Sequence, residues 1–203
     1  NQFVFHPAAS EQVYAATTVG AFYSKDAGRE WVERMSGMKE VHIVTSIAIN
    51  PKEPAVLYGG TTGGVYRSDD GAGTWKKINN GLIPETELMA AMALGVNAIE
   101  IDRTNPDVVY AGTTKGLFRT GNKGEQWERI GQAISDPFIS SLILPPKEPS
   151  QLYIGGSGGI WKTFDGGKTW QAMNQGLATV NIRALAMDPK NTQMLYAGTN
   201  GSG

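Results

Sequence analysis

Residues 163–170 read TFDGGKTW and place a carboxylate, two glycines and a tryptophan within one short segment. The side chain of Asp165 can accept hydrogen bonds from backbone N–H groups a little further along, which closes an Asx-type turn. The glycines that follow, Gly166 and Gly167, tolerate positive φ at little cost. Trp170 then buries a large flat face, worth about 2–3 kcal/mol. The stretch therefore predicts a hairpin turn, braced by its own side chains, between two strands.

The octet occurs four times along the chain. It reads SKDAGREW at 24–31, SDDGAGTW at 68–75, TGNKGEQW at 120–127 and TFDGGKTW at 163–170. A tyrosine precedes each copy by ten residues, and Tyr196 continues the series, so that the tyrosine spacings are 44, 52, 43 and 43 residues. Around each tyrosine, aliphatic residues alternate with small or polar ones, which is the period of a strand. A repeat of about 43 residues with four strands is typical of a β-propeller blade.

We therefore predict an all-β chain that forms a single β-propeller of four-stranded antiparallel blades, four of them complete and a fifth begun. The predicted blades span residues 1–36, 44–80, 96–131, 139–176 and 180–203. An open arc of blades leaves an unpaired edge, which propellers avoid by closing into a ring. This argument favours a larger propeller of about six to eight blades.

Variation among the octets indicates what their acidic residue does. The third copy carries Asn122 where the others carry aspartate. An amide still accepts a hydrogen bond from the backbone, but it cannot act as a general base or nucleophile. We therefore predict no catalytic residue in the octets and a structural role for them. The residues assigned to that role are Ser24, Asp26, Gly28, Trp31, Ser68, Asp70, Thr74, Trp75, Thr120, Asn122, Gly124, Trp127, Thr163, Asp165, Gly167, Thr169 and Trp170.

These octets resemble the Asp-box, Ser/Thr-x-Asp-x-Gly-x-Thr-Trp, of BNR-type repeats. The pattern is found in sialidases, sortilin-type receptors, xyloglucanase-type glycoside hydrolases and the photosystem II assembly factor family, and the resemblance covers nearly the whole chain. Glu30 and Ala72 depart from it at positions where threonine and glycine are usual. The resemblance implies turns on the outer rim, away from a central funnel where ligands bind. It also implies an extracytoplasmic protein, whether periplasmic, lumenal or secreted.

Two enzyme classes share the repeat. Sialidases need an arginine triad. Arg183 in NIRALA resembles their Arg-Ile-Pro signature only weakly. Xyloglucanase-type hydrolases carry a catalytic aspartate in a phrase like Asp-Val-Gly-Gly-Ala-Tyr-Arg, and the nearest match here is TTGGVYRSDD. Glycoside hydrolysis needs two carboxyl groups, and the aspartate's place is taken in the complete copies by Thr17, Thr61, Thr113 and Gly156. A hydrolase fragment, with catalytic groups on other blades, stays open as the alternative.

The link after Trp75 is longer than the others and contains PETELMAAMAL, a run of good helix formers behind a proline. In repeat folds, binding sites often lie in an extended loop. Such a loop can also fold onto its own blades. We predict that a protein partner binds here, through Glu85, Glu87, Leu88, Met89 and Met92, together with Phe138 from another link. The predicted function is a non-catalytic assembly scaffold, like photosystem II assembly factors; a glycan-binding or glycan-cleaving protein is the alternative.

Composition excludes several other classes. The formal net charge is −1, so nothing indicates nucleic acid as a partner. No apolar run approaches the roughly 18 residues that a membrane-spanning helix needs. His6 and His42 are the only histidines, there is no cysteine, and no metal-ligand spacing occurs. A phosphate-binding loop is also missing, so neither a metal nor a cofactor is expected.

Overall fold

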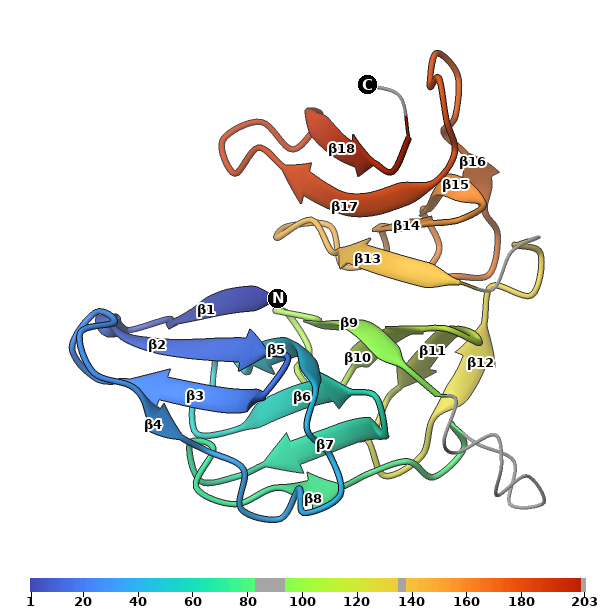
Figure 1. Ribbon diagram of the computed structural model, residues 1–203. Helices are drawn as coiled ribbons and strands as arrows, with labels where there is room; N and C mark the ends of the chain where they lie inside the picture. The colour runs from blue at the N-terminus through green and yellow to red at the C-terminus, as the bar shows by residue number, and fades with distance from the viewer. Residues whose placement is uncertain (83–93, 135–137, 202–203) are drawn as a thin grey trace.

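The computed structural model describes residues 1–82, 94–134 and 138–201, and every element in this part is a β-strand. The strands form four antiparallel sheets of four strands each and one pair, in chain order (Figure 1). Within each sheet, neighbours in sequence are neighbours in space, as in a β-meander. The first sheet consists of β1 (Gln2–His6), β2 (Ala9–Thr17), β3 (Gly20–Ser24) and β4 (Val32–Glu33).

The remaining sheets repeat this plan. The second consists of β5 (Val44–Ile49), β6 (Leu57–Thr61), β7 (Gly64–Ser68) and β8 (Lys76–Lys77). The third consists of β9 (Val96–Ile101), β10 (Val109–Thr113), β11 (Gly116–Thr120) and β12 (Glu128–Ile130). The fourth consists of β13 (Ile139–Ile143), β14 (Leu152–Gly156), β15 (Gly159–Thr163) and β16 (Gln171–Ala172), and the final pair of β17 (Ile182–Met187) and β18 (Leu195–Thr199).

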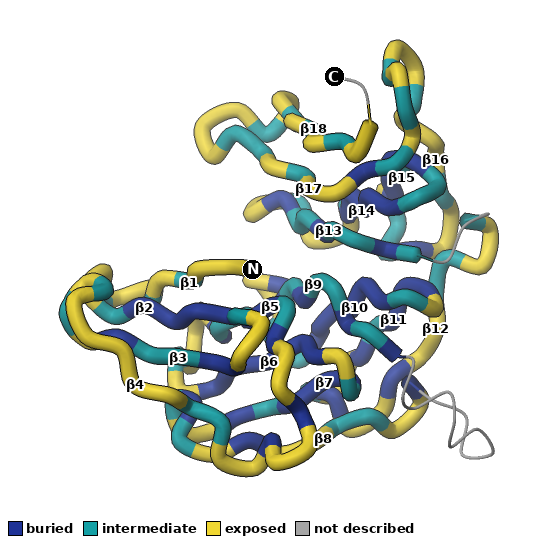
Figure 2. The backbone as a smooth tube through the Cα atoms, viewed as in Figure 1, coloured by how far each residue is buried: buried dark blue, intermediate teal, exposed yellow. Residues whose placement is uncertain are grey.

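The second strand of each middle sheet is buried on both faces. All five residues of β6, β10 and β14 are buried, and Figure 2 shows these strands in dark blue between more exposed neighbours. A strand that is covered on both faces carries apolar or small residues throughout, because neither face meets water. It therefore lacks the alternation of polar and apolar residues that a half-exposed strand shows. This explains phrases such as VYAGT, in which a central tyrosine is followed by residues small enough for the next sheet to approach.

The hydrophobic core is divided into clusters that lie between consecutive sheets. Tyr14 and Ala16 of the first sheet share one cluster with Ile47 and Trp75 of the second. A second cluster joins the second and third sheets, and a third joins the third and fourth. Each sheet is therefore stabilised mainly by burial against its neighbours, about 25 cal/mol for each Å² of apolar surface removed from water.

The tryptophan of an octet packs across the boundary between two consecutive sheets, which we call a seam. The Trp75 indole N–H donates to the Arg34 carbonyl of the preceding repeat at 2.9 Å, and that of Trp127 donates to the Ile78 carbonyl at 2.8 Å. Trp127 is 2% exposed, whereas Trp31, which has no preceding sheet among the described residues, is 38% exposed. The sequence predicted a brace within one hairpin; the structure shows that these rings also join one sheet to the sheet before it.

The seam between the third and fourth sheets is built differently. Trp170 donates its indole N–H to Gly167 of its own octet at 3.0 Å, not to the preceding repeat. Ala133 stands where the two earlier links carry Gly37 and Gly81. A Cβ at either glycine would lie 2.0 or 2.1 Å from the carbonyl oxygen of the next tryptophan, so alanine cannot be accommodated in the same approach. A hollow of about 660 Å³ also lies along this third seam, between residues of both sheets.

The prediction of an all-β chain with four-stranded antiparallel sheets is confirmed. The number of blades in the complete ring and the blade boundaries stay predictions. Within the described ranges, no helix is long and apolar enough to cross a membrane. The predicted helical turns of the long link fall at residues 83–93 and lie outside the described residues.

Candidate functional site

Each octet forms a compact network around its first and third residues. In the last copy, the Thr163 hydroxyl donates to Asp165 Oδ1 at 2.7 Å and accepts the Gly167 N–H at 3.0 Å. Asp165 also accepts the N–H groups of Lys168 and Thr169 at 3.0 and 2.9 Å, and its second oxygen accepts the Thr169 hydroxyl at 2.6 Å. The carboxylate therefore has its acceptor sites filled by its own turn, as expected for a residue that shapes the backbone.

The third octet makes the corresponding bonds with an amide. Thr120 donates to Asn122 Oδ1 at 2.7 Å, and the Gln126 N–H donates to the same oxygen at 3.0 Å. In the aspartate copies, the donors around the carboxylate favour its charged form. They lower the pKa of Asp165, chiefly through the Thr169 hydroxyl, and that of Asp70, chiefly through the Thr74 N–H.

Replacing Asp165 by alanine should lower the melting temperature more than replacing it by asparagine, because asparagine keeps the acceptor that Asn122 provides in the third copy. The pKa of Asp165 is lower in the folded chain than its ordinary value of 3.8, so its stabilising contribution is complete above that pH and is lost as pH falls below it. The asparagine variant should therefore lose less stability than the unsubstituted chain between neutral pH and about pH 2. Circular dichroism melts at several pH values measure both effects.

Asp107 provides a control for that experiment, since it is an exposed aspartate whose ion pair with Lys123 spans 3.5 Å. Its replacement by alanine should leave the melting temperature nearly unchanged, because exposed ion pairs contribute little. Equal melting temperatures for the alanine variants of Asp165 and Asp107 would contradict a structural role for the octet.

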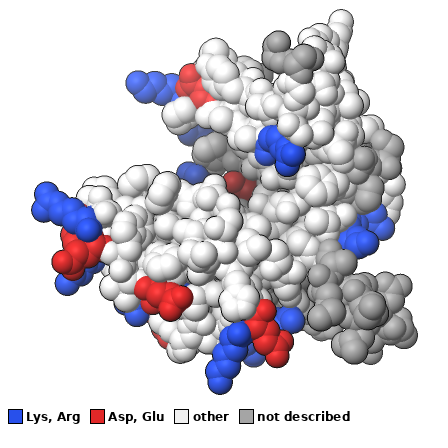
Figure 3. All heavy atoms as spheres, viewed as in Figure 1, with Lys and Arg blue, Asp and Glu red and all other residues white. Residues whose placement is uncertain are grey.

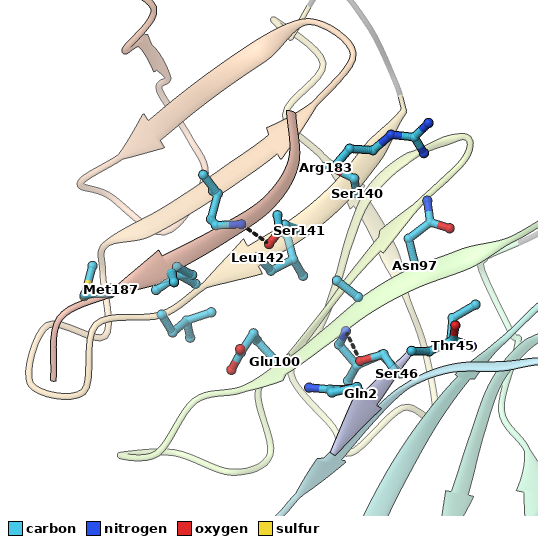
Figure 4. Close-up of a pocket in the computed structure, with 18 of the residues that line it drawn as sticks. Gln2, Thr45, Ser46, Asn97, Glu100, Ser140, Ser141, Leu142, Arg183 and Met187 are labelled. Atoms are coloured by element: carbon cyan, nitrogen blue, oxygen red, sulfur yellow. Dashed lines mark hydrogen bonds between the residues drawn. The ribbon is translucent and has the colours of Figure 1, made fainter. Parts of the chain in front are cut away.

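A different part of the molecule offers room for a ligand. The first strands of all five sheets, β1, β5, β9, β13 and β17, contribute residues to one hollow of about 540 Å³ (Figure 4). The surface is hollowed where the first three sheets face the last two, and charged atoms of both signs lie beside the notch (Figure 3). We refer to this space as the axial hollow. A concave site of this size, lined by several elements, is the usual place for a small ligand.

Most polar side chains at the axial hollow are already used to join the sheets. Asn97 Nδ2 donates to the Ile139 carbonyl at 2.7 Å, and Ser140 Oγ donates to the Ile182 carbonyl at 2.7 Å. Thr45 donates in the same way to Val96, the corresponding residue of the next sheet. Each of these donors is the second residue of its strand, so one position of the repeat links β5, β9 and β13 each to the first strand of the next sheet.

The next position of the repeat supplies acceptors. The Ser46 hydroxyl oxygen accepts the Ile99 N–H at 3.2 Å, and that of Ser141 accepts the Leu185 N–H at 3.1 Å. These backbone groups lie near register shifts in β9 and β17, which are edge strands of their sheets and have no strand of the same sheet on one side. The serines satisfy those groups and have a structural explanation.

Glu100 differs from these neighbours. Its side chain extends from β9 into the axial hollow (Figure 4), and within the described part of the chain its carboxyl group has neither a hydrogen-bond nor an ion-pair partner. The residue is half-buried between the sheets. This burial raises the pKa of Glu100 to about 7, against the opposing effect of the Arg103 charge. The group can therefore donate or accept a proton near neutral pH, which is a property of functional carboxyl groups.

The residues that take the place of a hydrolase aspartate are fixed in hairpin turns. The Thr61 hydroxyl donates to the Gly64 carbonyl and accepts the Gly63 N–H at 2.8 and 3.0 Å, and Thr17 and Thr113 make the same pair of bonds in their own turns. Thr61 and Thr113 are fully buried. A Cβ on Gly156 would lie 1.9 Å from the Phe138 carbonyl oxygen, so no larger side chain fits there.

The predicted partner-binding residues are only partly visible. Glu85, Glu87, Leu88, Met89 and Met92 lie outside the described residues. Phe138 is partly buried just before β13 and borders a small space together with Ile134, Ile154 and Trp161. It therefore lies against its own sheet.

The octets and the axial hollow are separate, since none of the octet residues lines the hollow. Sequence reasoning missed Glu100, although a signal was present. Glu100 pairs with Tyr110 in the ladder, and the residues that pair with the other repeat tyrosines are Val4, Ala48, Ile143 and Ala186. A single carboxyl group at a position that is otherwise apolar or small marks a departure from the repeat.

No protein-family model matches the chain. A probable oligoxyloglucan-reducing end-specific xyloglucanase of Neosartorya fischeri is 34% identical over 107 residues, a match that covers 50% of this chain and 12% of that protein. An ancestral GH74 enzyme matches in structure with a TM-score of 0.78 at 20% identity, over 97% of this chain and 27% of that one. The Niastella koreensis GH74 enzyme gives 0.72 at 21%, over 96% and 32%.

The extracellular domain of a putative one-component system of B. thetaiotaomicron is also similar, with a TM-score of 0.71 at 18% identity, over 94% of this chain and 25% of that one. The chain thus spans a third or less of the length of each of these proteins. The structural likenesses agree with a β-propeller fold.

These comparisons correct the predicted function. The expectation of a non-catalytic assembly scaffold is wrong, because the similar sequence is that of a xyloglucanase and solved GH74 enzymes share the fold. The findings favour the alternative, a carbohydrate-active protein, and none of them supports a protein partner. The wrong expectation came from weighing the absent aspartate in one phrase above the likeness of the repeats themselves.

Proposed function

We propose that this chain is part of a carbohydrate-active β-propeller protein and that it binds oligosaccharides of the xyloglucan type in its axial hollow. The observation that carries the proposal is the 34% identity over 107 residues to a xyloglucanase. The hollow of about 540 Å³ supports it, because first strands from five sheets converge there and Glu100 points into it without a partner.

The proposal concerns binding of a saccharide by the described residues, and it assigns no hydrolysis to them. Glycoside hydrolysis requires two carboxyl groups beside the scissile bond. Two line the axial hollow, but Asp188 Oδ1 already accepts the Lys190 and Asn191 N–H groups at 2.7 and 3.1 Å. Among the described lining residues, Glu100 is the one whose two carboxyl oxygens both lack a hydrogen-bond or ion-pair partner. We assign glycan recognition to this chain, with the octets holding turns on the outer rim.

Isothermal titration calorimetry of the purified chain with xyloglucan oligosaccharides tests the proposal. We expect saturable binding that maltohexaose, an α-linked glucan of similar size, does not reproduce. A reducing-end assay on the same samples measures hydrolysis separately from binding. Failure to bind any xyloglucan oligosaccharide at millimolar concentration would refute the proposed function.

An extracytoplasmic location, as the resemblance implied, forms part of the proposal. It is supported by the similar extracellular domain from B. thetaiotaomicron. Closure of the sheets into a ring of about six to eight blades also belongs to the proposal, because it would cover the apolar side chains that the first sheet exposes.

A further inference from the structure

Two residues of the third repeat depart from the pattern of the other copies and meet at the axial hollow. Glu100 occupies a ladder position that is apolar or small in the other first strands. Arg103 occupies the position at which the other copies carry proline, namely Pro7, Pro51, Pro146 and Pro189. Both line the hollow.

Neither departure is required by the fold. The turn after β9 is closed by Asp102, whose Oδ1 accepts the Thr104 and Asn105 N–H groups at 2.8 and 3.2 Å. Asn50 closes the corresponding turn of the second sheet in the same way, with Pro51 in the place of Arg103. The backbone at this position therefore accepts proline, and within residues 1–82, 94–134 and 138–201 the arginine side chain makes no hydrogen bond or ion pair.

An unpaired carboxyl group in a confined site is also costly to the folded chain. Glu100 and Arg103 influence each other electrostatically, but no ion pair joins them within the described residues. Residues that oppose stability and lack a structural partner are commonly kept for function. The Glu100 carboxyl group can accept a hydrogen bond and the Arg103 guanidinium group can donate one. A ligand group suited to both would donate to Glu100 and accept from Arg103.

We propose that Glu100 and Arg103 form a saccharide-binding pair in the axial hollow, bridged by adjacent hydroxyl groups of a neutral sugar. Hydroxyl groups meet the requirement because each is both donor and acceptor. The charged side chains lining the hollow are Glu100, Asp188, Arg103 and Arg183. Because acidic and basic side chains balance, a neutral ligand is favoured over an ionic one. This inference rests on the proposed function.

The test compares three variants in which the third repeat is returned toward the other copies: Glu100→Ala, as in Ala48 and Ala186, Arg103→Pro, and the two together. Each single variant should weaken xyloglucan oligosaccharide binding about tenfold or more, as expected for loss of a charged hydrogen bond. The double variant should lose much less than the product of the two factors, since both residues bind the same hydroxyl groups. Glu11→Ala, at an exposed acidic residue of β2 remote from the hollow, is the matched control and should bind normally.

Thermal melts of the same variants without ligand provide an independent readout. Glu100→Ala should raise the melting temperature above pH 7, because the ionised carboxyl is costly there. The gain should vanish below about pH 4.5, where the group is protonated in both states. Unchanged binding by both single variants, with the unsubstituted chain still binding, would overturn the assignment of the pair and leave the proposed function standing. A chain that binds no saccharide while Glu100→Ala is stabilised would instead overturn the proposed function and the assignment with it.

Discussion

Replacing Trp127 by alanine is expected to lower the free energy of unfolding by about 4 kcal/mol. The ring is 2% exposed, belongs to the cluster between the second and third sheets, and donates to the Ile78 carbonyl at 2.8 Å. Its removal creates a cavity in the seam and leaves that carbonyl without its donor, so two costs add. Urea unfolding followed by circular dichroism at 218 nm measures the loss.

Trp31 is the matched control, because it occupies the same position of its octet with a 38% exposed ring. It contacts Phe3, with the ring centroids 6.0 Å apart, but no preceding sheet covers it in the described chain. Alanine at this position should cost about 1 kcal/mol or less. Equal losses at Trp31 and Trp127 would show that the tryptophan stabilises its own hairpin and does not join the sheets.

Replacing Gly37 by alanine should be about as damaging, at about 4 kcal/mol or more. Its φ of 94° is unfavourable for alanine, and a Cβ would lie 2.0 Å from the Trp75 carbonyl oxygen. Backbone atoms cannot move aside as the end of a side chain can, so the first seam would have to open. The same urea titration, with near-ultraviolet circular dichroism as a probe of tryptophan packing, detects both the loss and its location.

Gly176 separates the two causes, since it occupies the same position of the fourth repeat with a φ of 86° and no atom within 4 Å of a Cβ built there. Alanine at this position should cost only the backbone strain, about 1–2 kcal/mol. If the Gly37 variant lost no more than the Gly176 variant, close approach of the sheets would not explain the glycine. The third repeat carries alanine, Ala133, at the position of Gly37, and a hollow lies along the third seam beside it.

Sequence periodicity predicted the strands well because each repeat provides the same evidence again. The tyrosines at positions 14, 58, 110, 153 and 196 all lie in second strands, and each octet begins at the last residue of a third strand. Local turn chemistry and alternation are properties of neighbouring residues, so one octet suffices to place a hairpin. The four short outer strands were harder to bound, since two or three residues carry little periodic signal.

The candidate site was missed because its residues belong to five different repeats. Asn97, Ser140 and Arg183 are each unremarkable in a half-exposed strand, and only their convergence shows a hollow. The departure of Glu100 from the pattern could be seen in the sequence, but its significance could not. An acid in a first strand is an ordinary solvated residue unless the other sheets enclose it.

The sequence by itself determined the repeat, the antiparallel sheets and the turns, because those depend on contacts within a single repeat. Tertiary structure alone decided which faces meet, which tryptophans are buried, where the third seam opens and why Glu100 is held in a hollow with a raised pKa. The physical reason is that burial and electrostatics depend on what surrounds a side chain. In this chain the surroundings come from repeats 40 or more residues away.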